Sequence, residues 1–289
     1  YCPELWEQIQ ARFKRFGRQP TENNRRQAYV PKGAIAIENP VGTAPIFIFE
    51  SGSRAVISLP GVPREMEHLL QHAILPYLQQ HYHIQGIIKA RVLHTAGAGE
   101  SQIDALVGDL EQLTNPTVGL AAHAGQVDVR ITAKADSVQA ADELIKPVEK
   151  TIRDRLGNWV YGADQESLEG IALKAVEREG WSLTVIESGL GGELIRRLAA
   201  VEGPFLGGQV LTALPTPSEL LSLTEDYRSS RAADVGLGVA LHPAGDKVDV
   251  YFALITPDST QQFMRPYGGP PESAPNWALH HSLDVIRKL

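Results

Sequence analysis

Hydrophobic residues recur along this chain at two spacings, one helical and one extended. The chain opens on a helical stripe through Leu5, Ile9 and Phe13. Three short apolar runs follow, at 34–37, 46–50 and 55–59, and each predicts a strand. A second helical stripe runs from Met66 to Leu78. Strands and helices that alternate in this way predict an α/β sheet, which we assign to residues 1–84.

The middle of the chain has a different order of elements. Apolar runs at 87–93, 118–121 and 127–132 predict strands. One helical stripe begins after residue 99, and a second covers 138–156. The resulting order, strand–helix–strand–strand–helix, predicts a small α+β domain over residues 85–162, with a linker from residue 161.

The last part of the chain, residues 163–289, again mixes helices and strands. Helical spacing covers 168–176 and the end of the chain, a strand is expected at 182–187, and a hairpin joins 235–241 to 248–254. The whole protein is therefore expected to be of the α/β class, with three domains.

Composition narrows the classes of function. Hydrophobic residues make up 43% and charged residues 21% of the chain, which is typical of globular proteins. The net charge is −7 and no basic run is present, so neither nucleic acid nor a membrane surface is an expected partner. The single cysteine, Cys2, excludes a disulfide framework, so we expect a cytoplasmic protein.

Two rigid loops that follow predicted strands, at 39–45 and 59–63, form the first candidate site. Ligands of open α/β sheets bind beyond the carboxyl ends of strands, and the helix after Pro63 would direct its free amides there, which suits a phosphate. Glu65, near the start of that helix, is a candidate metal or water ligand. The alternative is that proline and glycine only shape turns. The candidate phosphate-binding residues are Asn39, Gly42, Thr43, Ala44, Pro60 and Gly61.

The second candidate is Ser188, where a predicted strand ends at a glycine-rich turn before a helix. Such a corner exposes a hydroxyl and aims backbone amides at a developing oxyanion, for which Gly191 and Gly192 are the candidates. A serine nucleophile needs a base, and no histidine or lysine is adjacent in the sequence. The alternative is that Ser188 caps the helix.

Two weaker motifs have structural explanations. The segment Gly97–Ser101 lacks the further residues of a nucleotide-binding fingerprint, so it predicts a tight turn with a helix cap. His68 and His72 share one helix face, but no third ligand is near, which favours an exposed pair.

Several ordered motifs resemble the competence/damage-inducible protein A (CinA) family. They are Asn39–Pro45, Leu59–Met66, Gly97–Ser101, Leu156–Gly162 and Glu187–Gly192. The resemblance implies a molybdopterin-binding-like (MoaB-like) first domain that hydrolyses ADP-ribose or a similar nucleotide pyrophosphate with a divalent metal. It also implies a KH-like second domain, a nicotinamide-mononucleotide deamidase domain whose serine attacks the amide, and a homodimer.

This chain departs from the family pattern in two places. The glycine-rich, Asp-bearing stretch that helps bind phosphate and metal is expected before Tyr1. The Tyr and Lys that follow the Gly-Gly strand of the deamidases align with Thr212 and Pro217, and Gly189 and Leu190 replace Cys and Thr.

We therefore expect a hydrolase acting on a nucleotide pyrophosphate, with a degenerate deamidase domain. One alternative is an active nicotinamide-nucleotide amidohydrolase, in which Ser188 uses a relocated base such as Lys247. The other is a non-catalytic protein that senses a nucleotide or dimerises.

Overall fold

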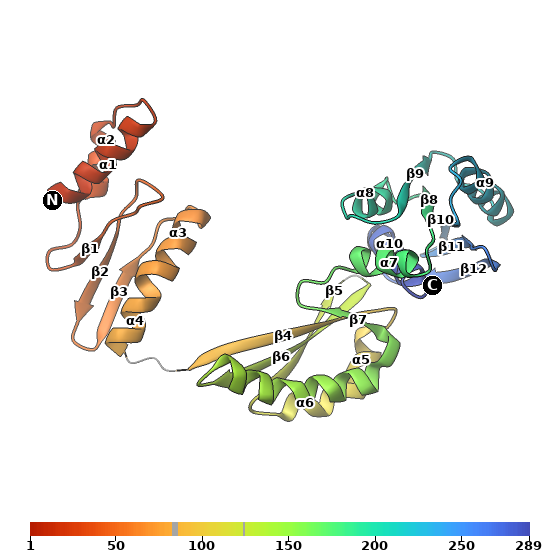
Figure 1. Ribbon diagram of the computed structural model, residues 1–289, viewed down its shortest axis with the longest axis horizontal. Coiled ribbons are helices and arrows are strands. Elements are labelled where there is room, and N and C mark those ends of the chain that lie inside the picture. Colours follow the sequence, from red (N-terminus) through yellow and green to blue (C-terminus); the bar gives the residue numbers. More distant parts are fainter. Residues whose placement is uncertain (83–85, 124) are drawn as a thin grey trace. The chain divides into compact units, whose positions relative to one another are not determined.

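The computed structural model describes residues 1–82, 86–123 and 125–289. The chain divides into two compact units, Tyr1–Gln85 and Gly86–Leu289 (Figure 1). The boundary that we expected between residues 84 and 85 lies outside the described residues, and the three-domain division stays a prediction. No helix in the described part of the chain has the length and apolar character needed to cross a membrane.

The first unit is built on a three-stranded sheet in the order β1-β2-β3, with β2 antiparallel to both neighbours. Its elements are α1 (Pro3–Arg15), α2 (Glu22–Arg25), β1 (Ile35–Ile37), β2 (Ile46–Ser51), β3 (Arg54–Ser58), α3 (Pro63–Leu69) and α4 (Leu75–Tyr82). The predicted helix from Met66 to Leu78 is present, although a π-helical turn, η2 (Leu70–Ile74), interrupts it. Ile46, Ile48, Leu69 and Ile74 form the core between sheet and helix.

The second unit begins with an antiparallel sheet in the order β5-β6-β4-β7. Its elements are β4 (Ile87–Ala96), α5 (Glu100–Val107), β5 (Thr117–His123), β6 (Gln126–Ala135), α6 (Val138–Leu156) and β7 (Val160–Ala163). The predicted order of strands and helices is confirmed up to α6. The segment from Tyr161, which we expected to be a linker, belongs to β7 because it pairs with β4.

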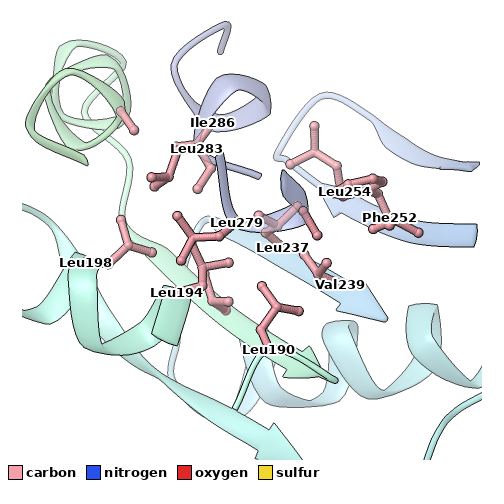
Figure 2. Close-up of a cluster of buried hydrophobic side chains, with 14 of the residues drawn as sticks. Leu190, Leu194, Leu198, Leu237, Val239, Phe252, Leu254, Leu279, Leu283 and Ile286 are labelled. Atoms are coloured by element: carbon pink, nitrogen blue, oxygen red, sulfur yellow. The ribbon is translucent and has the colours of Figure 1, made fainter. Parts of the chain in front are cut away.

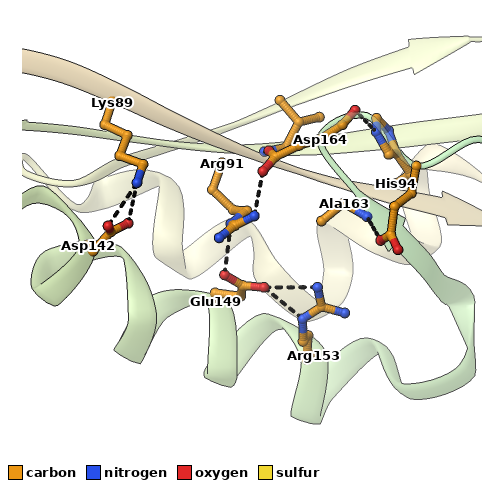
Figure 3. A network of polar contacts seen from close by, with 10 residues as sticks. Lys89, Arg91, His94, Asp142, Glu149, Arg153, Ala163 and Asp164 are labelled. Carbon is orange, nitrogen blue, oxygen red and sulfur yellow. Dashed lines mark hydrogen bonds and ion pairs between the residues drawn. The ribbon is translucent and has the colours of Figure 1, made fainter. Parts of the chain in front are cut away.

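Polar side chains tie α6 to this sheet (Figure 3). Lys89 on β4 pairs with Asp142 at 2.7 Å, and Arg91 bridges Glu149 of α6, at 3.2 Å, and Asp164 after β7. His94 contacts the carboxylate of Asp128 at 2.7 Å and the backbone carbonyl of Asp164 at 2.9 Å. Burial alone would lower the pKa of His94, but these two hydrogen bonds outweigh it, and the pKa lies above its usual value.

The C-terminal sheet has the order β12-β11-β10-β8-β9, in which β9, β8 and β10 are parallel and the other pairs antiparallel. Its elements are α7 (Leu168–Arg178), β8 (Leu183–Ser188), α8 (Glu193–Ala199), β9 (Phe205–Leu211), α9 (Pro217–Ser230), β10 (Val235–Ala244), β11 (Lys247–Ile255), β12 (Thr260–Tyr267) and α10 (Ala274–Ile286). The predicted hairpin, β10–β11, is confirmed.

Alternate residues of these strands face two cores. One face packs against α7, α8 and α10, where Leu194, Leu237, Phe252 and Leu279 meet (Figure 2). The other face packs against α9, and Ile186, Leu220, Ala240 and Ala253 are buried there. Since successive side chains of a strand point to opposite faces, Ser188 lies on the α9 face with Ile186, while Glu187 faces α8.

Candidate functional site

The two loops of the first candidate site come together in the structure. They follow β1 and β3, which both run antiparallel to β2, so their carboxyl ends share one edge of the sheet. Asn39 is 1% exposed and donates from its amide nitrogen to Glu65 Oε2 at 2.6 Å and to the carbonyl of Ala44 at 2.9 Å. Its Oδ1 accepts a hydrogen bond from the amide of Val41 at 3.0 Å. Asn39 therefore fixes the conformation of the loop and joins it to α3.

Gly42 is required at its position by lack of space. A Cβ added there would lie 1.8 Å from Glu65 Oε2 and 2.5 Å from Asn39 Nδ2. Gly61 has open space around it. Thr43, Ala44 and Pro60 are half-buried. The helix after this loop starts at Pro63 with no side-chain cap.

A pocket of about 410 Å³ lies beside Thr43. It is also lined by four residues from α1 and its C-terminal end, namely Arg12, Phe13, Phe16 and Arg18. Arg12 donates to the carbonyl oxygens of Pro40 and Val41, so the same side chain lines the pocket and supports the loop. Phe13, which belongs to the predicted helical stripe, is half-buried, whereas Phe16 is 69% exposed.

The chemistry expected of a divalent metal in the first unit needs several oxygen or imidazole ligands. Among the described residues no group of three or more His, Cys, Asp and Glu is placed to hold an ion. Glu65 supplies one carboxylate, which already accepts a hydrogen bond from Asn39. The residues described do not complete a metal site, and the metal stays a prediction.

Ser188 lies at the carboxyl end of β8, as predicted, and is 4% exposed. The turn that follows has positive φ angles at Gly189, Gly191 and Gly192, which favour glycine, and α8 starts directly after it. Ser188 Oγ donates to the carbonyl of Ala213 at 3.3 Å. Ala213 lines a pocket of about 520 Å³ formed by residues 209–215 and the first turns of α9. Ser188 therefore contacts the wall of this pocket.

The carboxylate of Glu187 uses the amides at the start of α8. It accepts a hydrogen bond from the amide of Ile195 at 3.3 Å, and the amides of Gly192 and Leu194 also stabilise its ionised form. Burial nevertheless raises the pKa of Glu187 above its usual value. The amide of Gly192 thus points to a buried carboxylate rather than to a ligand, while Gly191 is exposed.

The positions at which a base was expected hold none. Pro217 is the first residue of α9, where a proline fits because the first amides of a helix have no partner, and Thr212 precedes it in the loop. Ser188 is in register with Ala240 and, across it, with Tyr251. Lys247 lies four residues from Tyr251 along β11, about 13 Å at the rise of a strand, and is exposed. The structure does not bring Lys247 to Ser188.

Of the two weaker motifs, the turn with a helix cap is present as expected, whereas the histidine pair is exposed only at His72, and His68 is half-buried. Gly99 is the N-cap of α5, and its amide donates to Gln102 Oε1 at 3.0 Å. The rings of His68 and His72 contact each other at 4.4 Å.

Comparison with known proteins gives a consistent result. Residues 90–162 match the family profile described as the damage-inducible protein CinA KH domain. A Clostridium botulinum (strain Loch Maree / Type A3) protein that is named as competence-damage inducible is 33% identical over 312 residues, which cover 97% of this chain and 76% of that protein. A CinA-like protein of Parasynechococcus marenigrum (strain WH8102) is 37% identical over 235 residues, 80% of this chain and 56% of that protein.

Among solved structures, a competence or damage-inducible protein from Enterobacter asburiae aligns with 43% of this chain and 98% of its own, at 18% identity and a TM-score of 0.37.

Proposed function

Because this chain belongs to the CinA family, we propose that its first unit binds a nucleotide diphosphate of the ADP-ribose type, as the substrate of a pyrophosphate hydrolase. The observation that supports this is the pocket beside Thr43, which combines two arginines with two phenylalanines. Its volume of about 410 Å³ is in the range of small-molecule sites.

Each kind of side chain in this pocket matches a part of a nucleotide. Phenylalanine faces stack on bases, at about 1–3 kcal/mol per base. A guanidinium binds phosphate oxygens through two parallel hydrogen bonds. Arg12 is used in part by the loop carbonyls, so Arg18, which is exposed, is the arginine that we assign to the phosphate.

The rigid loop adds to this. Asn39 holds the loop that carries Thr43 in one conformation, so binding does not have to order it, and less affinity is lost to conformational entropy. The chemical step of hydrolysis is a separate matter, because the described residues do not complete a metal site.

Calorimetry with ADP-ribose on the full chain tests the binding. We expect Phe16→Ala and Arg18→Ala each to weaken binding about ten-fold or more, in line with the loss of one stacked ring or one charged hydrogen bond. Arg15→Ala is the matched control, since Arg15 is an exposed arginine of α1 that does not line the pocket. Equal affinities of all three variants and the wild type would contradict the assignment.

Release of AMP from ADP-ribose in the presence of Mg²⁺ tests the hydrolysis, with Gly61→Trp as the variant that fills the open space after β3. Equal rates would remove that loop from the site. Binding without turnover would favour the non-catalytic, nucleotide-sensing alternative.

A second candidate function is hydrolysis of a carboxamide, such as that of nicotinamide mononucleotide, by Ser188. The observation that favours it is the buried hydroxyl at the end of β8 beside a pocket of about 520 Å³. The test is release of ammonia, which Ser188→Ala should abolish. No release from the wild type would end this candidate.

A further inference from the structure

A histidine to which the sequence analysis gave no role lies on the strand that neighbours Ser188. Ser188 is in register with Ala240 of β10, and His242 follows two residues later on the same strand. Residues two apart in a strand share a face, so Ser188, Ala240 and His242 all lie on the α9 face. From a strand spacing of 4.8 Å and a rise of 3.3 Å per residue, the Cα atoms of Ser188 and His242 are about 8 Å apart. That distance is within the reach of an imidazole and a serine side chain that lean toward each other.

Two contacts show that these segments are packed together. A Cβ added to Gly189 would lie 3.0 Å from the Cβ of Leu241, so the turn after Ser188 rests on the residue before His242. The ring of His242 meets that of Tyr251 edge to face at 4.7 Å, and Tyr251 is the residue of β11 in the same row as Ser188.

The imidazole of His242 has an unused nitrogen. Its Nε2 is shielded from solvent and has no hydrogen-bond partner among the described residues. A buried polar atom without a partner is uncommon in folded proteins and is often retained for a function. Ser188 Oγ is held by the carbonyl of Ala213 at 3.3 Å, a long hydrogen bond for a hydroxyl, so a small rotation of the side chain would release it.

A carboxylate stands on the far side of the histidine. Asp249 of β11 is directly opposite His242 in the antiparallel pair, and it is half-buried. Side chains opposite each other in such a pair have Cβ atoms about 4.5–5.5 Å apart. No hydrogen bond joins Asp249 to His242, both of which the structure describes, so a rotation of the carboxylate is needed before it can accept a hydrogen bond from the imidazole.

We propose that His242 is the base that activates Ser188, with Asp249 as its positioning residue. The proposal rests on the second candidate function, hydrolysis of a carboxamide at Ser188. The nucleophile, the base and the orienting carboxylate would come from three neighbouring strands, β8, β10 and β11, so the base lies between its two partners in the sheet.

The reaction balances with water as the one co-reactant. Ser188 Oγ attacks the amide carbon while its proton passes to His242 Nε2. The C–N bond then breaks, and the proton on His242 goes to the leaving nitrogen, which departs as ammonia. Water attacks the acyl ester, His242 accepts a proton from it, and the ester C–O bond breaks to release the acid and restore the Ser188 hydroxyl.

Covalent labelling with diisopropyl fluorophosphate tests the activation without knowledge of the substrate. Ser188 Oγ would displace fluoride from phosphorus, and mass spectrometry of the full chain would locate the label. We expect labelling of the wild type at Ser188 and a rate about 100-fold lower in His242→Gln, the usual size of a general-base contribution. His72→Gln is the matched control, because His72 is exposed and lies in the first unit. Thermal unfolding would show that each variant is folded.

Two further readouts separate a chemical role from a structural one. The labelling rates of the wild type and of His242→Gln should depend differently on pH, because the substitution removes the group that accepts the serine proton. Asp249→Asn should slow labelling in the wild type but have no effect in His242→Gln, since a positioning residue acts through its partner.

Each outcome decides the proposal. Absence of label on wild-type Ser188, or a rate in His242→Gln equal to that of the wild type, would overturn it. If His242→Gln does not fold, the labelling rate of Asp249→Asn decides, since a rate equal to that of the wild type would contradict the proposal. Labelling that depends on His242 without ammonia release from nicotinamide mononucleotide would leave the base assigned and remove that substrate. Ammonia release at the full rate in His242→Gln would support that substrate and remove His242 as the base.

Discussion

Replacing Asn39 with alanine should release the loop of the first unit by a predictable amount. The change removes two hydrogen bonds to or from the backbone, with Val41 and Ala44, and one to the carboxylate of Glu65. Neutral hydrogen bonds contribute about 1 kcal/mol each and a bond to a charged group about 1.5–3 kcal/mol, so the expected loss is roughly 4 kcal/mol. The side chain is 1% exposed, so water cannot replace these partners without the loop opening.

Hydrogen exchange measured by mass spectrometry on the full chain resolves this loss locally, which is useful in a chain of two compact units, because multi-domain proteins often do not unfold in a single transition. At about 1.4 kcal/mol per factor of ten, protection of the peptides spanning 39–66 should fall by roughly 10³-fold. Asn23→Ala, an exposed substitution on α2, is the control and should change protection by less than about three-fold. A fall of less than ten-fold in Asn39→Ala would refute the claim that this amide fixes the loop.

Three other substitutions probe the second unit. The raised pKa of His94 means that its contribution to stability is fully present below the unfolded imidazole pKa of about 6.5 and is lost as the pH rises through the folded value. The denaturation midpoints of the wild type and His94→Gln should therefore differ at about pH 5.5 and converge at about pH 9. A difference that stays constant with pH would contradict this. Phe252→Ala should lower the free energy of unfolding, measured by urea titration, by about 3–5 kcal/mol, because the residue is 1% exposed and its ring stacks on that of Phe263 with centroids 4.9 Å apart. A loss under about 1 kcal/mol would show that the surrounding side chains collapse into the cavity. Gly208→Ala should cost about 1–3 kcal/mol in the same titrations, since its Cβ would lie 2.8 Å from the carbonyl oxygen of Val185; an unchanged midpoint would mean that β8 and β9 can separate at little cost.

The sequence predicted the elements whose apolar residues repeat without interruption. It missed β9, where Gly207 and Gly208 break the alternation, and β12, an edge strand that opens on polar residues. It also missed α9, whose inward face uses few large side chains because Gly236 and Gly238 of β10 bring the sheet close to the helix. A signal for α9 was present in the capping pair of Thr216 and Glu219.

The residues of the candidate sites likewise include some that the sequence could predict and some that it could not. That Asn39, Gly42 and Glu65 lie together could be predicted, because both loops follow strands whose carboxyl ends meet at the same end of the sheet. The argument holds for this antiparallel sheet as well, since β1 and β3 run in the same direction on either side of β2. Arg18 and Phe16 could not be assigned, because a helix stripe does not show which of its rings stays exposed. His242 was hidden for a different reason. It lies 54 positions after Ser188, and only the register of β8 with β10 brings the two together.

The linings of the two pockets indicate different ligands. The first unit offers Arg12 and Arg18 beside phenylalanine faces, which matches an anionic nucleotide. The described residues that line the pocket beside Ser188 include no cation, and their one carboxylate, Glu219, caps α9 through the amide of Thr216 at 2.7 Å. A phosphate placed there would meet a negative charge and no counter-charge, whereas the ring of a carboxamide substrate would meet Val210, Leu214 and Leu223. If Ser188 hydrolyses an amide, this lining should therefore favour the nucleoside over its phosphorylated form, because the pocket supplies apolar contact to the ring but no cation for the phosphate.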